Sequence, residues 1–119
     1  MTLSPEAVAT AFSGHRFAEA YPHLHEDLRW TLVGDTVLAG KSAAVEACES
    51  TLAGLAETTT RFTRFKTIVC ADAVVVDSVA EYESADGSIT VASCDLYDFK
   101  DGQVVAIRSY TVEVPAESP

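Results

Sequence analysis

The stretch that decides the fold is Ser88–Val114, SITVASCDLYDFKDGQVVAIRSYTVEV. It is rich in β-branched and aromatic residues, which is typical of β-strands. Asp101-Gly102 divides it, and an Asp-Gly pair between two such runs indicates a tight hairpin turn. We therefore predict two long antiparallel strands. On the first of them, Asp95 stands among residues predicted to face the protein interior.

The composition is that of a globular protein. The chain has 119 residues, of which 48% are hydrophobic and 22% charged. This length predicts a single domain over residues 1–119. The 18 acidic and 8 basic residues give a net charge of −10. Such a charge repels phosphate backbones and anionic lipids, so we expect neither a nucleic acid nor a membrane as partner.

Two features favour a cytoplasmic location. The N-terminal sequence lacks the basic region and apolar run of a secretory signal. Cys48, Cys70 and Cys94 are widely spaced and form no C-x-x-C motif. An odd number of isolated cysteines is typical of a protein whose thiols stay reduced, and we expect these three to be buried.

Three helices are predicted in the first half of the chain. The first begins at Ser4, which can cap a helix and is followed by proline, and ends at Ser13-Gly14. The second is a short piece over residues 16–23. The third is capped by Ser42 and ends before three consecutive threonines at 58–60. Its apolar residues recur at helical spacing: Val45, Cys48, Leu52 and Leu55.

The remaining segments are predicted to be strands. A first strand over residues 28–32 points Leu28, Trp30 and Leu32 inward. Four more follow the third helix as an antiparallel meander. This order predicts an α+β fold, in which a cone-shaped, curved antiparallel sheet carries the three helices on its concave face. The four strands of the meander are Arg61–Cys70, Ala73–Glu83, Ser88–Phe99 and Val104–Val114.

Register decides which side chains face the interior, because a slip of one residue turns a strand over. A two-residue turn at Asp86-Gly87 places Ser78 opposite Asp95. The same register points residues 74, 76, 80, 82, 91, 93, 97 and 99 inward. In the preceding strand, the inward side chains would be Thr63, Phe65, Thr67 and Val69.

The last hairpin has two alternative registers. A two-residue turn at Asp101-Gly102 would bring Arg108 inward beside Asp95, together with residues 104, 106 and 110. A three-residue turn with a bulge would instead point Val105, Ile107, Ser109 and Thr111 inward. We prefer the second, because burying an arginine is less favourable than burying two hydroxyls.

The element order and several short motifs resemble the nuclear transport factor 2-like superfamily. These motifs are Asp27 before Trp30, the Gly40-Lys41 entry to the third helix, and Tyr97-Asp98-Phe99-x-Asp101-Gly102 followed by Val104. The superfamily includes ketosteroid isomerase, limonene epoxide hydrolase, scytalone dehydratase and SnoaL-type polyketide cyclases. The resemblance implies the cone-shaped fold and a ligand pocket inside it.

Carried onto this sequence, the catalytic groups of these enzymes are incomplete. Asp95 takes the place of the ketosteroid isomerase aspartate that donates a hydrogen bond to the steroid oxyanion. The base of that enzyme falls near Leu32 and its tyrosine near Val8, and neither side chain transfers protons. The epoxide hydrolase positions fall at Ser109 and at Ser93-x-Asp95. The resemblance therefore implies neither of these two reactions.

Asp95 is the main candidate for a catalytic residue. Burial in an apolar pocket would raise its pKa and make it an acid or a base, with Tyr97 as a second candidate. The alternative is a structural carboxylate satisfied by its neighbours, with the aromatic residues as core. The candidate ligand-binding residues are His15, Trp30, Ser78, Tyr82, Ser93, Ser109 and Thr111.

These residues predict a protein that binds a small apolar or aromatic molecule, with acid-base chemistry of the isomerase, cyclase or dehydratase class. We expect no cofactor and no metal, since His23-x-His25 has no third ligand at a defining spacing. A homodimer through the outer face of the sheet is expected. The alternative function is a non-catalytic dimerisation or partner-binding module whose pocket is vestigial.

Overall fold

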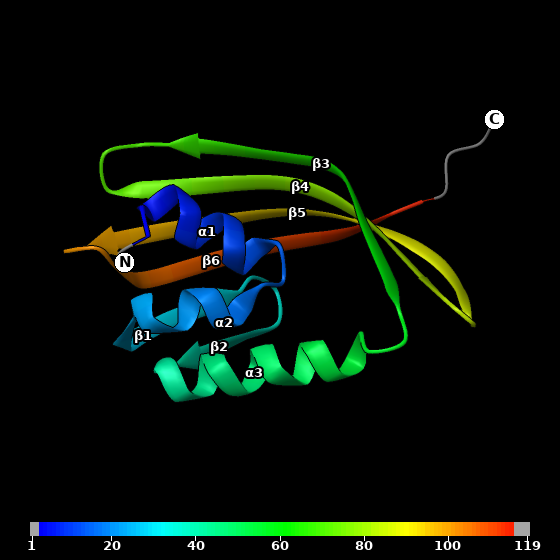
Figure 1. Cartoon of the computed structure of the whole chain (residues 1–119), viewed down its shortest axis with the longest axis horizontal. Coiled ribbons are helices and arrows are strands. Elements are labelled where there is room, and N and C mark those ends of the chain that lie inside the picture. Colours follow the sequence, from blue (N-terminus) through cyan, green and yellow to red (C-terminus); the bar gives the residue numbers. More distant parts are fainter. Residues whose placement is uncertain (1–2, 116–119) are drawn as a thin grey trace.

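A computed structural model describes residues 3–115 of the chain. One layer of helices lies against one curved sheet (Figure 1), which confirms the predicted α+β class. The helices are α1 (Pro5–Ser13), α2 (Phe17–Ala20), the short 3-10 helix η1 (Tyr21–His23) and α3 (Lys41–Gly54). The strands are β1 (Leu24–Leu32), β2 (Thr36–Ala39), β3 (Thr59–Val69), β4 (Ala73–Ser84), β5 (Gly87–Lys100) and β6 (Gln103–Val114).

The sheet is mixed rather than purely antiparallel. Its strand order is β2-β1-β6-β5-β4-β3, and β1 runs parallel to β6 while the other neighbours are antiparallel. The predicted meander forms β3 to β6. Strand β2 was not predicted, because its four residues are mostly exposed and carry no alternating pattern. The pairing of β1 with β6 joins segments far apart in the sequence, which local patterns do not reveal.

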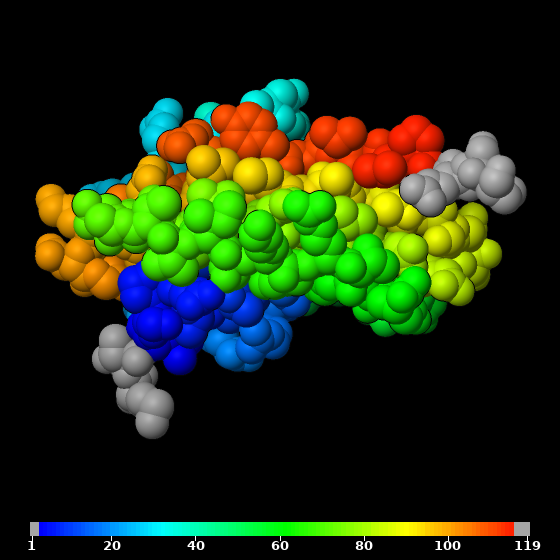
Figure 2. All heavy atoms as spheres, turned by 90° about the horizontal axis from the view of Figure 1, so that it is seen from above, coloured from blue at the N-terminus to red at the C-terminus, as the bar shows by residue number. Residues whose placement is uncertain are grey.

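The helices cover one face of the sheet. In Figure 2 the blue atoms of the N-terminal helices lie on one side of the strand layer. The predicted cap of α1 is confirmed, since the Ser4 hydroxyl accepts a hydrogen bond from the Ala7 amide at 3.1 Å. The core between the layers includes Val8, Phe12, Leu28, Tyr97 and Ile107.

Helix α3 begins differently from the prediction. Its N-cap is Gly40, and Ser42 lies in its first turn. Gly40 has a φ of 95°, which favours glycine, and its amide donates to the Leu28 carbonyl at 2.6 Å. The bond to β1 therefore fixes where α3 starts. Ala44 and Cys48 are the buried residues of the helix, whereas Leu52, one of the apolar residues at helical spacing, is exposed.

The β4–β5 register is shifted by two residues from the prediction. Ser84 pairs with Gly87 around an Ala85-Asp86 turn, so Asp95 lies opposite Val76 and not opposite Ser78. The Ser84 hydroxyl accepts a hydrogen bond from the Asp86 amide, and this local bond favours a turn that lies one residue earlier than predicted. A two-residue shift leaves every side chain on its predicted face.

The last hairpin combines features of both alternatives. Lys100 pairs with Gln103 around a two-residue turn whose residues, Asp101 and Gly102, both have positive φ. The bulge lies further along β6, at Val105, because Phe99 pairs with Val104 and Asp98 with Ala106. The bulge restores Ile107, Ser109 and Thr111 to the inward side, as predicted. Val104 is buried in place of Val105, and Arg108 is exposed.

A second bulge, at Thr63 in β3, changes which residues face inward there. Phe62 pairs with Ala80 and Arg64 with Val79, so Thr63 is the extra residue and is exposed. Phe62 therefore takes the inward place predicted for Thr63. Phe65 and Thr67 are partly buried as predicted, but Val69, at the end of the strand, is 56% exposed.

Two smaller findings concern the cysteines and membranes. None of the three cysteines is in a disulfide, and Cys48 is buried, but Cys70 in the β3–β4 turn is exposed, contrary to the prediction. Within residues 3–115, no helix has the length and apolar character needed to cross a bilayer.

Candidate functional site

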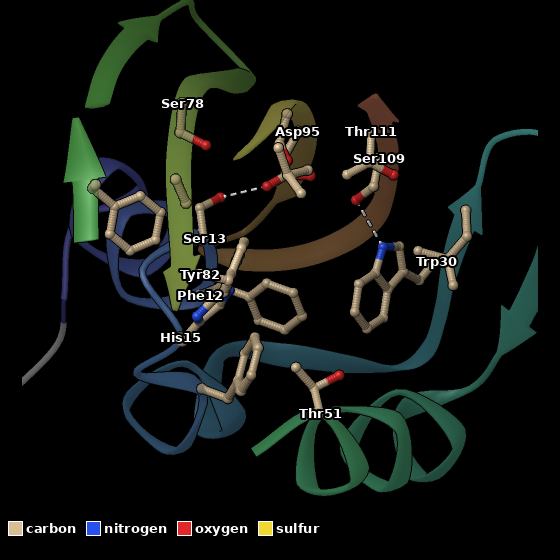
Figure 3. Close-up of a pocket in the computed structure, with 16 residues that line it drawn as sticks. Phe12, Ser13, His15, Trp30, Thr51, Ser78, Tyr82, Asp95, Ser109 and Thr111 are labelled. Atoms are coloured by element: carbon tan, nitrogen blue, oxygen red, sulfur yellow. Dashed lines mark hydrogen bonds between the residues drawn. The ribbon is translucent and has the colours of Figure 1, made fainter. Parts of the chain in front are cut away.

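A cavity of about 210 Å³ lies between the concave face of the sheet and the helices. Figure 3 shows its walls, with residues from α1, the α1–α2 turn, α3 and the central strands. All but one of the predicted site residues line it. They are His15, Trp30, Ser78, Tyr82, Ser93, Asp95, Ser109 and Thr111.

Asp95 is held by a short chain of hydroxyl groups. The Ser13 hydroxyl, at the C-terminal end of α1, donates to a carboxylate oxygen of Asp95 at 2.8 Å (Figure 3). The Tyr97 hydroxyl lies 2.5 Å from the Ser13 oxygen. Because Ser13 has one proton and gives it to Asp95, Tyr97 must donate to Ser13. The chain therefore runs from Tyr97 through Ser13 to Asp95.

A second chain approaches Asp95 from β1. The Trp30 indole N–H donates to the Ser109 hydroxyl oxygen at 2.9 Å (Figure 3). Ser109 is buried and is the cross-strand partner of Asp95. With its oxygen occupied by Trp30, Ser109 can direct its own proton toward the carboxylate. Two hydroxyls, each backed by another donor, thus orient the Asp95 side chain.

Burial raises the pKa of Asp95 above the ordinary value for an aspartate. Hydrogen bonds from Ser109 and Ser13 oppose this rise, as does the charge of His15. Desolvation is the largest of these effects, because the ionised carboxylate loses more solvation free energy on burial than the hydrogen bonds from two hydroxyls restore. Asp95 therefore exchanges its proton closer to neutral pH than an exposed aspartate does.

Tyr97 does not lie where a ligand would meet it. It is fully buried, with 0% of its surface exposed, and is absent from the cavity wall. Its predicted role as a second catalytic residue is therefore corrected: the phenol supports Ser13 from behind. Burial and the nearby Asp95 raise the pKa of Tyr97 well above the usual range, which keeps it a hydrogen-bond donor.

His15 forms part of the wall near the opening. It is in the left-handed backbone region, with a φ of 67°, at the turn between α1 and α2. Its ring lies 5.6 Å from Phe17, 5.6 Å from Phe62 and 6.1 Å from Tyr82, measured between ring centroids. Burial lowers the pKa of His15, while the charge of Asp95 partly opposes this. Burial therefore favours the neutral form of the imidazole.

Ser13 is the main residue that sequence reasoning missed. It was interpreted only as the end of the first helix. Its position four residues after the buried Ala9 places it on the buried side of α1, so a serine continuing an apolar stripe was the available signal. Phe12, Phe17, Phe62 and Thr51 of the wall were also missed.

A second, larger space adjoins the cavity. It has a volume of about 540 Å³ and lies between the C-terminal end of α3 and the β4–β5 hairpin. His15, Thr51, Tyr82 and Val91 line both spaces, so these residues form the neck between an inner cavity and an outer chamber. The outer chamber is more open to solvent and includes the half-exposed Ile89.

The histidines give no sign of a metal centre. His25 uses its Nδ1 atom to accept a hydrogen bond from the Asp27 amide at 2.9 Å. Within the part of the chain that the structure describes, no three His, Cys, Asp or Glu side chains are grouped as metal ligands.

The fold agrees with comparisons to known families. The sequence profile described as the SnoaL-like domain matches residues 6–107. The chain belongs to the SnoaL-like family. This confirms the resemblance drawn from the sequence. None of the curated proteins compared with this SnoaL-like chain matches its sequence.

Solved structures with the same fold are distant in sequence. An NTF2-like protein of unknown function from Cytophaga hutchinsonii is 23% identical, with a TM-score of 0.80 over 90% of this chain and 95% of the other. A candidate SnoaL-like polyketide cyclase from Jannaschia is 16% identical, with a TM-score of 0.71 over 89% and 83%. A limonene epoxide hydrolase-like (LEH-like) epoxide hydrolase from Mycobacterium tuberculosis is 17% identical, with a TM-score of 0.68 over 90% and 78%.

Proposed function

We propose that this SnoaL-like protein binds a small apolar or aromatic molecule in the inner cavity and transfers protons to or from it through Asp95. The observation that carries the proposal is a carboxylate of raised pKa at the cavity wall, oriented by Ser13 and supported from behind by Tyr97. A buried acid is unfavourable for stability, and such groups are concentrated at functional sites.

The cavity volume limits the size of the ligand. A dry cavity of about 150 Å³ is enough for benzene, whereas drug-sized ligands occupy roughly 300 to 1,000 Å³. At about 210 Å³, the inner cavity suits one ring with small substituents. Phe12, Phe17 and Trp30 supply aromatic walls for it, and a longer ligand would extend through the neck into the outer chamber.

The chemistry we propose uses one carboxylate for both directions of proton transfer. Asp95 would take a proton from a carbon next to a carbonyl and return it to another atom of the same molecule, as an isomerase, cyclase or dehydratase requires. Leu32 and Val8, near which the resemblance places the other catalytic positions of ketosteroid isomerase, supply no second proton-transfer group. No cofactor enters this scheme.

Binding is tested first with p-cresol, a single-ring probe, and the chain's one tryptophan is the reporter. The indole N–H signal of Trp30 in NMR spectra should shift on titration, and Asp95→Asn should change the affinity. Asp98→Asn is the matched control, because Asp98 lies on the same strand but pairs with Arg108 on the outer face. An unmoved Trp30 signal, or equal effects of both variants, would contradict the proposal.

Proton transfer is tested by conversion of 3-cyclohexenone to its conjugated isomer, followed by ultraviolet absorbance. We expect the wild type to accelerate the reaction and Asp95→Asn to reduce the acceleration by at least 100-fold, the lower end of what a positioned acid or base contributes, roughly 10² to 10⁴. Binding without any acceleration would limit the function to ligand binding.

A non-catalytic interaction module is the second candidate function. The observation that favours it is the outer face of the sheet, where Tyr110 and Val112 are 44% and 64% exposed. In this role a second copy of the chain would cover that face.

We also propose a cytoplasmic location, in keeping with three thiols that form no disulfide.

A further inference from the structure

The concave face carries a row of three hydroxyls across its central strands. Ser78 on β4 pairs with Ser93 on β5, and Ser93 pairs with Thr111 on β6. All three line the inner cavity. The neighbouring row along the same strands contains Asp95 and Ser109. The hydroxyl row is therefore one step along the sheet from the carboxylate, on the same face.

These three hydroxyls are free to form hydrogen bonds to a ligand in the cavity. Within residues 3–115, no hydrogen bond joins Ser78, Ser93 or Thr111 to another side chain or to the backbone through the hydroxyl, in contrast to Ser13 and Ser109. No buried side-chain oxygen of the described chain lacks a partner, so the Ser78 and Ser93 oxygens, which make no hydrogen bond, are accessible. Thr111 is itself an exposed residue that lines the cavity. A hydroxyl that faces an apolar-walled cavity favours a ligand that can pair with it.

The charges around the row limit the ligand further. The cavity lining of the described chain contains no lysine or arginine, and Asp95 is its one carboxylate. A carboxylate or phosphate on the ligand would be repelled by Asp95 and would find no cation. A bare hydrocarbon would leave the three hydroxyls unpaired. The ligand that fits is neutral and carries oxygen atoms.

The spacing of the row favours one arrangement of those oxygens. Neighbouring strands lie about 4.8 Å apart, and each contributes one hydroxyl. Oxygens in a 1,3 relation on a six-membered ring are separated by a similar distance, whereas 1,2 oxygens are closer and 1,4 oxygens are further apart. A ring edge with two 1,3 oxygens can therefore face two neighbouring hydroxyls at once.

We propose that the inner cavity selects a neutral, single six-membered ring with two oxygen substituents in a 1,3 relation, bound by the row Ser78–Ser93–Thr111. This proposal rests on the proposed function, since it assumes that the cavity takes a ligand. To the proposed binding function it adds the chemical class of the ligand and the residues that select this class. Ser93 is the central residue, because it belongs to both neighbouring pairs of the row.

The test compares single-ring probes that differ in the position, number and charge of their oxygens. Dissociation constants for resorcinol (1,3), hydroquinone (1,4), phenol, toluene and 3-hydroxybenzoate are measured by NMR titration of the Trp30 indole signal. Resorcinol should bind at least threefold more tightly than hydroquinone or phenol, as expected for one added hydrogen bond. The anionic 3-hydroxybenzoate should bind more weakly than phenol.

Variants then assign the effect to the row. Ser93→Ala should weaken resorcinol binding about threefold to tenfold and leave toluene unchanged. Thr111→Val, which preserves the side-chain shape, should weaken resorcinol through the loss of the hydroxyl alone. Ser50→Ala is the control, because Ser50 is exposed on α3 and lies outside the cavity. Unchanged resorcinol binding in Ser93→Ala and Thr111→Val would overturn the proposal.

The outcomes separate this proposal from the one on which it rests. If phenol and toluene bind beside Trp30 but resorcinol shows no advantage over hydroquinone, the 1,3 selection is wrong and the ligand site stands. If none of the five probes moves the Trp30 signal in the wild type, the binding function itself is contradicted.

Discussion

The chain of hydroxyls behind Asp95 makes a specific prediction about folding stability. Ser13 contacts both Asp95 and Tyr97, at 2.8 and 2.5 Å, so its removal affects two partners at once. Tyr97→Phe removes only the outer end of the chain and leaves the bond from Ser13 to Asp95 intact. The effects of Ser13→Ala and Tyr97→Phe on the free energy of unfolding should therefore not add.

The expected magnitudes follow from burial. Tyr97→Phe loses one buried hydrogen bond, which is about 1 kcal/mol. Ser13→Ala loses the charge-assisted bond to Asp95 and leaves the phenol of a 0% exposed tyrosine without a partner, which together is roughly 2–3 kcal/mol. In the double variant the stranded phenol is absent. We expect it to be less destabilised than the sum of the single variants by about 1–2 kcal/mol.

Urea unfolding at constant pH, followed by far-ultraviolet circular dichroism, measures all four proteins of the cycle. Ser50→Ala corrects for the higher helix propensity of alanine, because Ser50 is exposed within α3. Tyr110→Phe, on the exposed face, corrects for loss of a phenol group in a strand. Each 1 kcal/mol should also shift the melting temperature by about 4 °C for a domain of this size.

Additivity would refute this reasoning. If the double variant matches the sum of the single variants within about 0.5 kcal/mol, Tyr97 and Ser13 are not coupled in solution. If Ser13→Ala is no more destabilising than Tyr97→Phe, the stranded phenol has found another partner. In either case Tyr97 would not support Ser13 from behind.

Asp95→Asn should stabilise the protein at pH 7, because the net raised pKa of Asp95 means that ionisation of this carboxylate opposes folding. Because the pKa of Asp95 is higher in the folded protein than in the unfolded chain, the wild type is most stable below the unfolded-state pKa and loses stability as pH rises through the folded-state pKa. Urea unfolding of the wild type and Asp95→Asn between pH 3 and 8 checks this. A stability gain in Asp95→Asn that does not grow with pH contradicts it. The NMR ring signals of His15 should titrate with a pKa below 6.5, and with a still lower pKa in Asp95→Asn, where the neighbouring negative charge is gone. A higher His15 pKa in that variant would show that the two groups do not interact. For 4-alkylphenols, each methylene that enters the outer chamber should tighten binding about fourfold, and affinities independent of chain length in titrations would show that the chamber is not used. We propose that a second copy of the chain covers the outer face of the sheet, so Val112→Glu should give monomers in sedimentation velocity experiments. Val33→Glu, on the exposed β1–β2 turn, should not. A monomeric wild type would contradict this.

The sequence predicted the faces of the strands better than their pairings. Alternation along β4 and β5 placed Ser78, Ser93 and Asp95 on one face, and the structure has them there. The turn that closes the hairpin lies at Ala85-Asp86, beside a hydrogen bond to Ser84, and the register therefore differs from the predicted one by two residues. Because two is the period of a strand, the error left the face unchanged.

The contents of the site were harder to predict where segments distant in sequence meet. Trp30 was predicted to line a pocket, but its hydrogen bond to Ser109 depends on the parallel pairing of β1 with β6. Ser13 reaches Asp95 because α1 crosses the sheet beside β5, 82 residues later in the chain. Local patterns give the direction of a side chain, whereas its partners depend on how the layers pack.

The inner cavity itself arises from a gradient of side-chain size along the central strands. At the covered end, Tyr97 and Ile107 fill the space under the helices completely. Toward the opening, the same inward positions hold Asp95 and Ser93 on β5 and Ser109 on β6, which are smaller than Tyr97 and Ile107 and line the cavity instead of filling it. Larger apolar residues there would close the cavity and strengthen the core. The core is incompletely packed at this end, and its wall carries a carboxylate and free hydroxyls. This arrangement lowers the stability of the fold, as binding sites commonly do.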